Sequence, residues 1–475
     1  MYQVPQHISK DKIFIVNKSD IDGRLDPKMA LYNQSVQYAL YPMVKLQSLL
    51  LSKPQYGANE ASITRDNNEQ PRYIRITDID ENGLISPDEL GATVANLDDK
   101  YILNENDIVI ARSGATVGKA YIHKNLPYTC VYAGYLIRFI VDSKKILPDY
   151  LFAYTQLNTY KEWVNAIQRP SAQPNINAEE YQSLEIPLPN LSKQQEIVGY
   201  INTAYAQKRA KEVEAQQLLD SIDDYLLKEL GITMPNINAE LTDRIFYVNY
   251  SDLSNRLDPY YSLKYFQKSF EAVHSGKYPV VSLKSLSTLI TSGITPKSGG
   301  DAYVDDRLNG IPFIRSGNIN IDGELDFNDL LYIRPDVHKT IMKSSQVRKN
   351  DLMIAIVGAT IGQVGIYVFD NEANINQAIA LVRLKDGINV EYVKELIKSS
   401  IGQLSLNRLK RPVARANINL EEIATIQVVL PPYEIQQKIA NQIQCIRRQA
   451  KALQAEGKAI LDNAKHKVEQ MIIGK

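Results

Sequence analysis

The sequence has little cysteine, tryptophan or histidine and no long apolar run. Its two cysteines, Cys130 and Cys445, lie far apart among 475 residues and form no disulfide framework, which is typical of a protein in a reducing cytoplasm. No stretch approaches the roughly 20 apolar residues that a membrane span requires. The first residues lack the apolar segment of a secretory signal. We therefore expect a cytoplasmic protein.

The sequence also lacks an excess of either charge, with 54 basic and 54 acidic side chains. A protein that binds duplex DNA by itself usually carries a clear basic excess. A nucleic-acid surface on this chain would require a local arrangement of charge, or a partner that supplies part of the phosphate neutralisation. The length predicts two to four domains.

Motifs for catalysis are missing as well. SGATVGK (113–119) has three residues between its glycines, where a phosphate-binding loop has four, so a strand, a glycine turn and a second strand are favoured. LPPYE (430–434) is close to the motif of amino-methyltransferases, but Leu430 cannot accept the hydrogen bond that this motif needs. The five histidines form no metal-ligand spacing with the cysteines. We expect no enzymatic activity and no metal or cofactor on this chain.

What the sequence does contain is a tandem repeat with a period of about 240 residues. Four blocks recur in the same order, namely 14–27 with 246–259, 73–83 with 313–323, 107–122 with 351–366, and 175–201 with 417–443. Between the blocks the copies diverge, as a comparison of 50–70 with 288–310 shows. A shared scaffold with different loops predicts two sites of one kind that bind different targets.

Each repeat ends in a segment with apolar residues at alternating steps of four and three. The two series are Ile197, Ile201, Ala204, Lys208, Lys211, Ala215, Leu218, Ile222, Tyr225 and Ile439, Ile443, Ile446, Ala450, Leu453, Gly457, Ile460, Ala464, Met471. This spacing predicts two coiled-coil helices, each roughly 60 Å long. Gly231 and Pro235 are expected to end the first. We expect the two to pair antiparallel with pseudo-two-fold symmetry, because helices of nearly forty residues are too long to lie on separate domains.

The segments before the helices are predicted to be mixed α/β. Short β-rich runs lie between Gly, Asn and Pro turns, at 73–76, 108–111, 135–140, 311–314, 352–357 and 379–384. Helices are expected at 149–167 and 389–404. The predicted organisation is a first α/β domain at 1–190, a helix at 191–232, a second α/β domain at 233–431 and a helix at 432–475.

This arrangement resembles the specificity subunits of type I restriction–modification systems. The resemblance rests on RLDPYY (256–261), DIVIA with GATVG (107–118), PNIN (174–177), and IPLP with QQEI (186–197). Each block alone is weak, but together, in order and twice, they are specific and cover essentially the whole chain. One departure is Lys28-Met29, where the second repeat has Tyr260-Tyr261.

The resemblance implies that each domain recognises one half of a bipartite site in double-stranded DNA and that the paired helices set the spacing. It also implies a non-catalytic chain bound to two methyltransferase (modification) subunits, and to restriction subunits that translocate and cleave DNA. S-adenosylmethionine, ATP and Mg are expected on those partners. The alternatives are the specificity chain of a related type IIB-like system and a coiled-coil adaptor that does not bind DNA.

Candidate DNA contacts are basic and amide side chains in loops, because Arg and Lys suit guanine and Asn suits adenine. The divergent segments offer Arg65, Asn67, Asn68, Arg72, Lys297, Ser298, Arg307 and Asn309, and further candidates are Arg112, Lys119 and Arg383. The paired loops 168–175 and 410–417 share Arg169 and Arg411, which suit phosphate contacts or could equally cap a helix end. Arg415 in the second loop is a further candidate DNA contact. Any of these residues could equally be an ordinary solvated side chain. Arg75 and Arg315 are expected to be structural.

Overall fold

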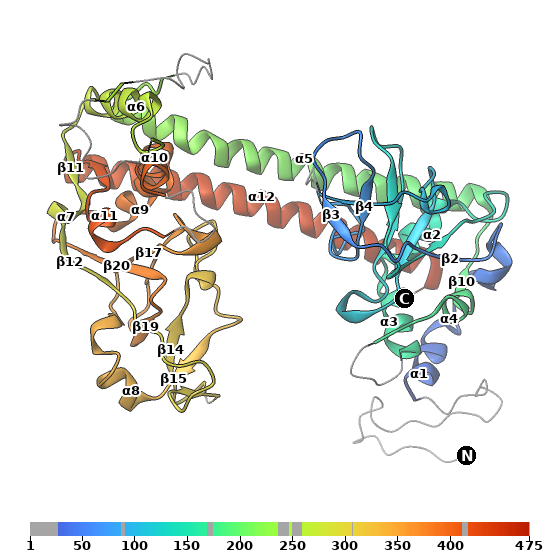
Figure 1. Cartoon of the computed structure of the whole chain (residues 1–475). Helices are drawn as coiled ribbons and strands as arrows, with labels where there is room; N and C mark the ends of the chain where they lie inside the picture. The colour runs from blue at the N-terminus through green and yellow to red at the C-terminus, as the bar shows by residue number, and fades with distance from the viewer. Residues whose placement is uncertain are drawn as a thin grey trace. The chain divides into compact units, whose positions relative to one another are not determined.

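The computed structural model describes residues 27–86, 91–168, 174–235, 247–248, 259–305, 307–410 and 417–474. The chain divides into two compact units, one formed by 1–212 with 454–475 and the other by 213–453. Each unit therefore contains one α/β domain and a part of both long helices (Figure 1). None of the helices described is long and apolar enough to cross a membrane.

The first domain is a mixture of short strands and helices that ends in the long helix α5. Its elements are α1 (Pro27–Val36), β1 (Met43–Lys45), β2 (Gln55–Tyr56), β3 (Ser62–Thr64), β4 (Arg72–Ile74), β5 (Ala92–Val94), β6 (Ile108–Ala111), β7 (Ala120–Ile122), β8 (Cys130–Tyr132), β9 (Leu136–Phe139), α2 (Pro148–Thr155), α3 (Asn158–Ile167), α4 (Ala178–Gln182), β10 (Glu185–Pro187) and α5 (Leu191–Leu230).

The second domain has the same order of main elements and ends in the long helix α12. Its elements are α6 (Lys264–His274), β11 (Val280–Ser282), α7 (Leu283–Leu286), β12 (Ser287–Ser292), β13 (Tyr303–Val304), β14 (Ile311–Ile314), β15 (Leu331–Ile333), α8 (Pro335–Lys339), β16 (Gln346–Val347), β17 (Leu352–Ala355), β18 (Val364–Ile366), β19 (Ala373–Ile375), β20 (Ile379–Leu384), α9 (Val390–Lys398), α10 (Ser400–Leu409), α11 (Leu420–Ala424), β21 (Gln427–Val429) and α12 (Tyr433–Ile473).

The sheet topology repeats between the two domains. The antiparallel order β2-β9-β6-β7 of the first domain returns as β12-β20-β17-β18 in the second, and the parallel pair β4-β8 returns as β14-β19. The central strands β6 and β17 are buried along their whole length, which explains their uninterrupted apolar sequences. The mixed α/β fold predicted from the sequence is thus confirmed. The domains differ at β14, which in the second domain belongs to a five-stranded sheet.

The repeated Gly-Ala-Thr segments form glycine turns between two strands. Gly114 and Gly358 both have φ +76°, and Gly118 and Gly362 have φ +87° and +92°. A side chain at Gly118 would also collide with Val164, 2.8 Å from its Cβ position. Only glycine adopts these conformations without strain. The glycines are thus explained by the backbone, which confirms the prediction of a strand, a turn and a strand.

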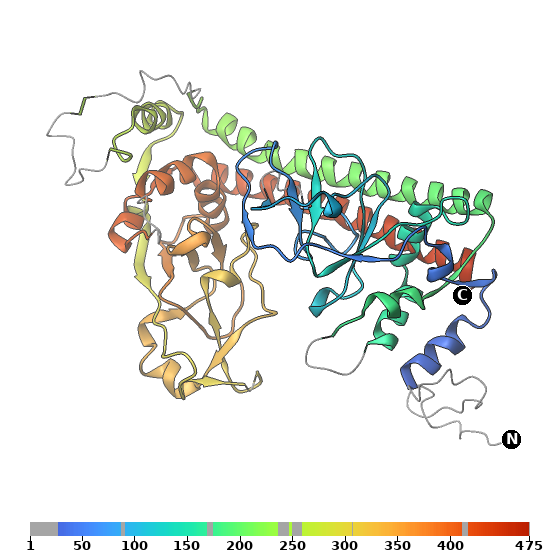
Figure 2. The ribbon, with the colours of Figure 1, turned by 45° about the vertical axis from the view of Figure 1, so that its right-hand side comes forward.

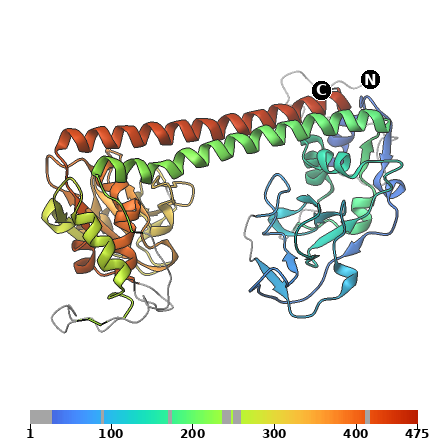
Figure 3. The same cartoon turned by 90° about the horizontal axis from the view of Figure 1, so that it is seen from above.

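The two long helices pack against each other in an antiparallel manner within each unit (Figure 3). In the first unit, Ile197 and Ile201 of α5 share an apolar cluster with Leu461 and Val468 of α12. In the second unit the pairing is reversed along the helices, so that residues late in α5 and early in α12 come together, namely Ile222, Leu226 and Leu230 with Ile439, Ile443 and Ile446. The predicted pairing is confirmed.

The seam between the long helices departs from the predicted spacing near the end of α12. Leu461 and Val468 are buried there, whereas the predicted Ile460 and Met471 are only half-buried, because the last turns of α12 also face the core of the first domain. At Gly457 the helices approach closely, since a Cβ on this glycine would lie 3.3 Å from the Lys208 carbonyl oxygen.

The ends of the helices are set by local chemistry. Gly231 adopts φ +66° directly after α5, and the Ile232 amide donates to the Leu227 carbonyl at 2.9 Å, which forms a Schellman cap. The predicted helical stretches at 149–167 and 389–404 are confirmed, and each is divided into two helices, α2 with α3 and α9 with α10. In the second pair the chain turns tightly, so that a Cβ on Gly402 would lie 2.2 Å from Ile397 Cα.

The first glutamine of each repeated Gln-Gln pair makes buried hydrogen bonds near the start of a long helix. The buried Gln194 side chain accepts from the Leu147 amide at 2.8 Å and donates to the Pro189 carbonyl at 2.9 Å. Gln436 makes the same two bonds, to Asn389 at 3.0 Å and to the Pro431 carbonyl at 2.8 Å. Buried amides need such partners, so each pair fastens a long helix to the domain before it.

Candidate nucleic-acid interface

Two of the predicted base contacts in the first domain are buried. Arg65 and Arg72 are 0% and 3% exposed, and both contact Tyr128. The Arg65 guanidinium lies 4.4 Å from the centre of the Tyr128 ring, and its Nε donates to the Gln70 carbonyl at 2.9 Å. Arg72 donates to the Tyr128 hydroxyl at 3.1 Å and to the Ser86 carbonyl at 2.8 Å. In this conformation both arginines hold the divergent loop in place and do not reach solvent.

The tip of the same loop is exposed. Asn67 Oδ1 accepts from the amides of Glu69 and Gln70 at 3.0 and 3.2 Å, a local turn that asparagine forms readily. Asn68 is also exposed. In this loop, Asn67 and Asn68 are therefore exposed to solvent, whereas Arg65 and Arg72 are buried.

An arginine stacked on a tyrosine lies beside the glycine turn of the first domain. The Arg112 guanidinium is 4.8 Å from the centre of the Tyr56 ring, and the Arg112 amide donates to the carbonyl of the exposed Tyr135 at 2.9 Å. Cations and exposed aromatic rings together suit contacts with phosphates and bases. At the same position the second repeat has the buried Ile356. Tyr56 and Tyr135 were missed from the sequence, where the high tyrosine count of 29 was the only signal.

The remaining predicted lysine of the first domain lies at the other end of this turn. Lys119 is half-buried, and its Nζ lies 3.4 Å from the Ile79 carbonyl oxygen. Both Lys119 and Arg112 are half-buried, and Lys119 faces a backbone carbonyl whereas Arg112 stacks on a tyrosine ring.

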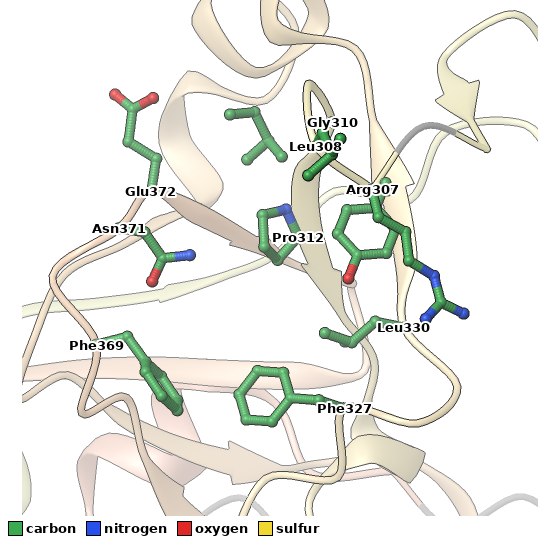
Figure 4. A pocket seen from close by; sticks show the side chains of 11 residues that line it. Arg307, Leu308, Gly310, Pro312, Phe327, Leu330, Phe369, Asn371 and Glu372 are labelled. Atoms are coloured by element: carbon green, nitrogen blue, oxygen red, sulfur yellow. The ribbon is translucent and has the colours of Figure 1, made fainter.

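The predicted contacts of the second domain fall into two exposed loops. Lys297 and Ser298 lie in a tight turn in which the Gly300 amide donates to the Lys297 carbonyl at 3.0 Å. Arg307 and Asn309 lie in the loop between β13 and β14, which is also exposed. Arg307 borders a pocket of about 530 Å³ (Figure 4).

Arg383 is engaged inside the second domain. It forms a bidentate ion pair with the buried Asp351, at 2.8 Å from Nε to Oδ1 and 2.6 Å from Nη2 to Oδ2. Arg138 pairs with Asp107 in the first domain at 3.4 Å. Burial raises the pKa of Asp107, and the nearby Arg138 opposes that shift. The shared pairing assigns Arg383 a structural role, contrary to its prediction as a DNA contact.

The two repeated arginines that were expected to be structural are paired with carboxylates. Arg75 donates to both carboxylate oxygens of Asp78, at 3.0 and 2.9 Å. Arg315 forms an ion pair of 2.7 Å with Asp329. Both guanidiniums brace the loop that follows β4 or β14.

Three predicted DNA contacts, Arg169, Arg411 and Arg415, lie outside the described residues. The described ends of their loops rejoin the fold beside the glycine turns, since Asn175 bridges Ser113 and Asn417 bridges Val357. In both domains, the described end of this loop therefore lies against the residue just before the glycine turn.

Carboxylates on the long helices anchor the domains in each unit. Glu469 of α12 accepts from the amide and hydroxyl of Thr159 at 2.6 and 2.5 Å, where α3 begins. In the second unit, Asp223 of α5 accepts from the Ser400 amide at 2.8 Å, where α10 begins. The domain in each unit is thus fixed by the long helix that follows the other domain in the sequence.

A charged junction adds to this anchoring in the second unit. The buried Glu395 forms an ion pair of 2.7 Å with Arg447 of α12. Lys398 nearby donates to the Asp322 carbonyl. Burial lowers the pKa of Lys398 to about 8, and the positive charge of Arg447 adds to this shift. The group borders a cavity of about 410 Å³.

Comparisons with known proteins give a consistent result. The family model of the type I restriction modification DNA specificity domain matches residues 57–219 and 262–459. The EcoBI specificity subunit of a type I restriction enzyme from Escherichia coli is 27% identical over 301 residues, which is 62% of this chain and 58% of that subunit. The match thus spans less than two thirds of the EcoBI subunit.

A second relative is the EcoKI specificity subunit of Escherichia coli strain K12, which is 21% identical over 382 residues, or 78% of this chain and 74% of that subunit. Among solved structures, a chain from work on complex assembly and conformational transition of the type I R-M system aligns with a TM-score of 0.48 at 17% identity. That alignment covers 90% of this chain and 97% of the other.

Proposed function

The chain belongs to the type I restriction modification DNA specificity family, and we propose that it is the sequence-recognising subunit of a type I restriction–modification complex. Each domain recognises one half of a bipartite site in double-stranded DNA. The paired helices α5 and α12 connect the two recognition domains. The chain itself catalyses no reaction.

The observation that carries this proposal is the contrast between scaffold and loops. The order of the four-stranded sheet, the glycine turns and the contacts of Gln194 and Gln436 are the same in both domains. The candidate contacts differ, with the exposed Asn67 and the half-buried Arg112 in the first domain and the exposed Lys297 and Arg307 in the second. Two copies of one scaffold with different exposed side chains are what recognition of two different half-sites requires.

Partners complete the proposed activity. Two modification subunits carry S-adenosylmethionine and transfer its methyl group to adenine N6, and restriction subunits bind ATP and Mg for translocation and cleavage. Adenine methylation requires the target base to leave the helix and enter the pocket of the partner, so this chain only needs to contact neighbouring base pairs. The zero net charge of the chain supports a division in which the partners neutralise part of the DNA phosphate.

Genome-wide mapping of N6-methyladenine tests the proposal. The chain is co-expressed with the methyltransferase encoded beside it in a host without DNA methylation, and the methyltransferase alone is the control. A single bipartite motif with an unspecified gap is expected only when both proteins are present. An intact complex that adds no methylation, or adds it without sequence preference, would contradict the proposal and favour a coiled-coil adaptor.

A further inference from the structure

The second domain has an apolar pocket beside Arg307. The pocket has a volume of about 530 Å³, and its walls include Leu308, Phe327, Leu330 and Phe369. Figure 4 shows Phe327 and Phe369 side by side at one end of it. In Figures 1 and 2, β14, β15 and α8 lie at the end of the second domain that is away from its part of α12. The pocket lies on these strands.

The aromatic wall of the pocket is held firmly. The rings of Phe327 and Phe369 meet edge to face, with centres 4.9 Å apart, and Tyr367 supports Phe369 at 5.6 Å. The buried Tyr367 is itself fixed, because its hydroxyl donates to Asn371 Oδ1 at 2.9 Å. The wall is therefore preorganised for an apolar group.

The walls are unusually exposed for apolar residues. Leu308 is 94% exposed, and Phe327 and Phe369 are each 39% exposed. The first domain is polar at the matching position. Counted from the shared strands β7 and β18, Phe369 corresponds to Asn125, which donates to Glu105 at 2.9 Å. The pocket thus belongs to the parts of the repeat that differ between the domains, as a sequence-recognising surface must.

The rim of the pocket carries the Arg307 guanidinium, which favours a ligand with hydrogen-bond acceptors. Asp329 pairs with Arg315 at 2.7 Å and Asp370 with Lys349 at 3.0 Å, and a carboxylate oxygen of Glu372, which lines the pocket, lies 3.6 Å from Nε2 of the buried His338. Arg307 forms no ion pair with any carboxylate in the described part of the chain. An exposed guanidinium beside an apolar pocket matches a DNA major groove, where guanine presents acceptors and thymine presents a methyl group.

We propose that this pocket determines specificity in the second half-site by binding the C5-methyl group of a thymine, with Leu308, Phe327 and Phe369 as the contact surface. Arg307 at the rim recognises a guanine next to that thymine. This inference rests on the proposed function, because it names the base that the second domain recognises. The ligand of the pocket is thus a base of the DNA site.

Replacement of thymine by uracil tests the inference directly. The assembled complex is titrated with duplexes that carry the mapped site, in which each thymine of the second half-site is replaced in turn by uracil. Loss of one buried methyl contact is expected to weaken binding about fourfold at one position. The same replacement in the first half-site is the control for general effects of uracil. Specific binding with no thymine in the second half-site, or with no effect of uracil, would overturn the inference and leave the proposed function intact.

Protein variants connect that effect to the pocket. Leu308→Ala and Phe369→Asn, the latter matching the first domain, are expected to weaken binding to the thymine duplex and to remove its advantage over the uracil duplex. Ile341→Ala changes an exposed apolar residue outside the pocket lining and is expected to retain the advantage. If the assembled variants keep the preference for thymine, or if the variants no longer assemble with the methyltransferase, the pocket does not bind the thymine methyl group and the inference is wrong.

Discussion

The anchoring of α3 by Glu469 gives a prediction about stability. The carboxylate accepts from the amide and hydroxyl of Thr159, and both residues are buried. Glu469→Ala leaves two donors without this acceptor, at about 1–3 kcal/mol each, and removes a negative charge at a helix N-terminus that contributes about 0.3–1 kcal/mol. We expect the free energy of unfolding of the first unit to fall by about 3 kcal/mol.

The assay uses the only tryptophan of the chain. Trp163 is buried in α3, one turn after Thr159, so its fluorescence during urea unfolding reports on the affected helix. With a slope of roughly 2–3 kcal/mol per molar urea, the midpoint is expected to fall by about 1 M. Glu469→Gln keeps a hydrogen-bond acceptor at this position, so its urea midpoint is expected to fall by less than that of Glu469→Ala.

The matched control lies on the same helix. Glu456 forms an exposed ion pair of 3.0 Å with Lys211, and Glu456→Ala is expected to lower the stability by less than about 1 kcal/mol. Equal shifts of the Trp163 transition in Glu469→Ala and Glu456→Ala would refute the assignment of Glu469 as an anchor.

Three further predictions follow from the other contacts. The pKa of Lys398 lies at about 8 in the folded chain, below its ordinary 10.5. Between these values the unfolded chain binds more protons than the folded chain, so the free energy of unfolding should rise as the pH increases from 7 to 9.5. In urea unfolding, Lys398→Met should lose this rise, and a rise equal to that of the parent would contradict the assignment to Lys398. Asp351→Ala leaves the half-buried Arg383 unpaired and should lower stability by about 3–5 kcal/mol, whereas unfolding like that of the parent would argue against a structural pair. Arg112→Ile, which copies the second repeat, should weaken DNA binding and reduce the salt slope by about 1 if Arg112 contacts a phosphate, and an unchanged affinity would remove it from the interface.

The sequence predicted well those features that are repeated or periodic. The tandem blocks predicted two domains of one topology, and the apolar spacing predicted that residues such as Ile201 and Ile443 would be buried between the long helices. Both signals extend over many residues, and burial of an apolar stripe is a strong constraint.

Individual side chains were harder to predict, because burial and pairing depend on residues that are distant in sequence. Arg65 and Arg72 lie in a polar, divergent segment, yet Tyr128 covers one and accepts a bond from the other. Arg383 forms an ion pair with Asp351, which lies just before the neighbouring strand of the same sheet. The pocket of the second domain was missed because Phe327 and Phe369 belong to separate loops, and only the fold brings their rings together.

Exchange of one recognition domain tests the central claim most directly. Residues 233–431 are replaced by the corresponding segment of a relative with a different mapped site, and N6-methyladenine is mapped with the same methyltransferase. If each domain recognises one half-site, the half recognised by the second domain changes while the other half and the presence of a gap are retained. An unchanged motif, or a change in both halves, would contradict the assignment of one half-site to each domain.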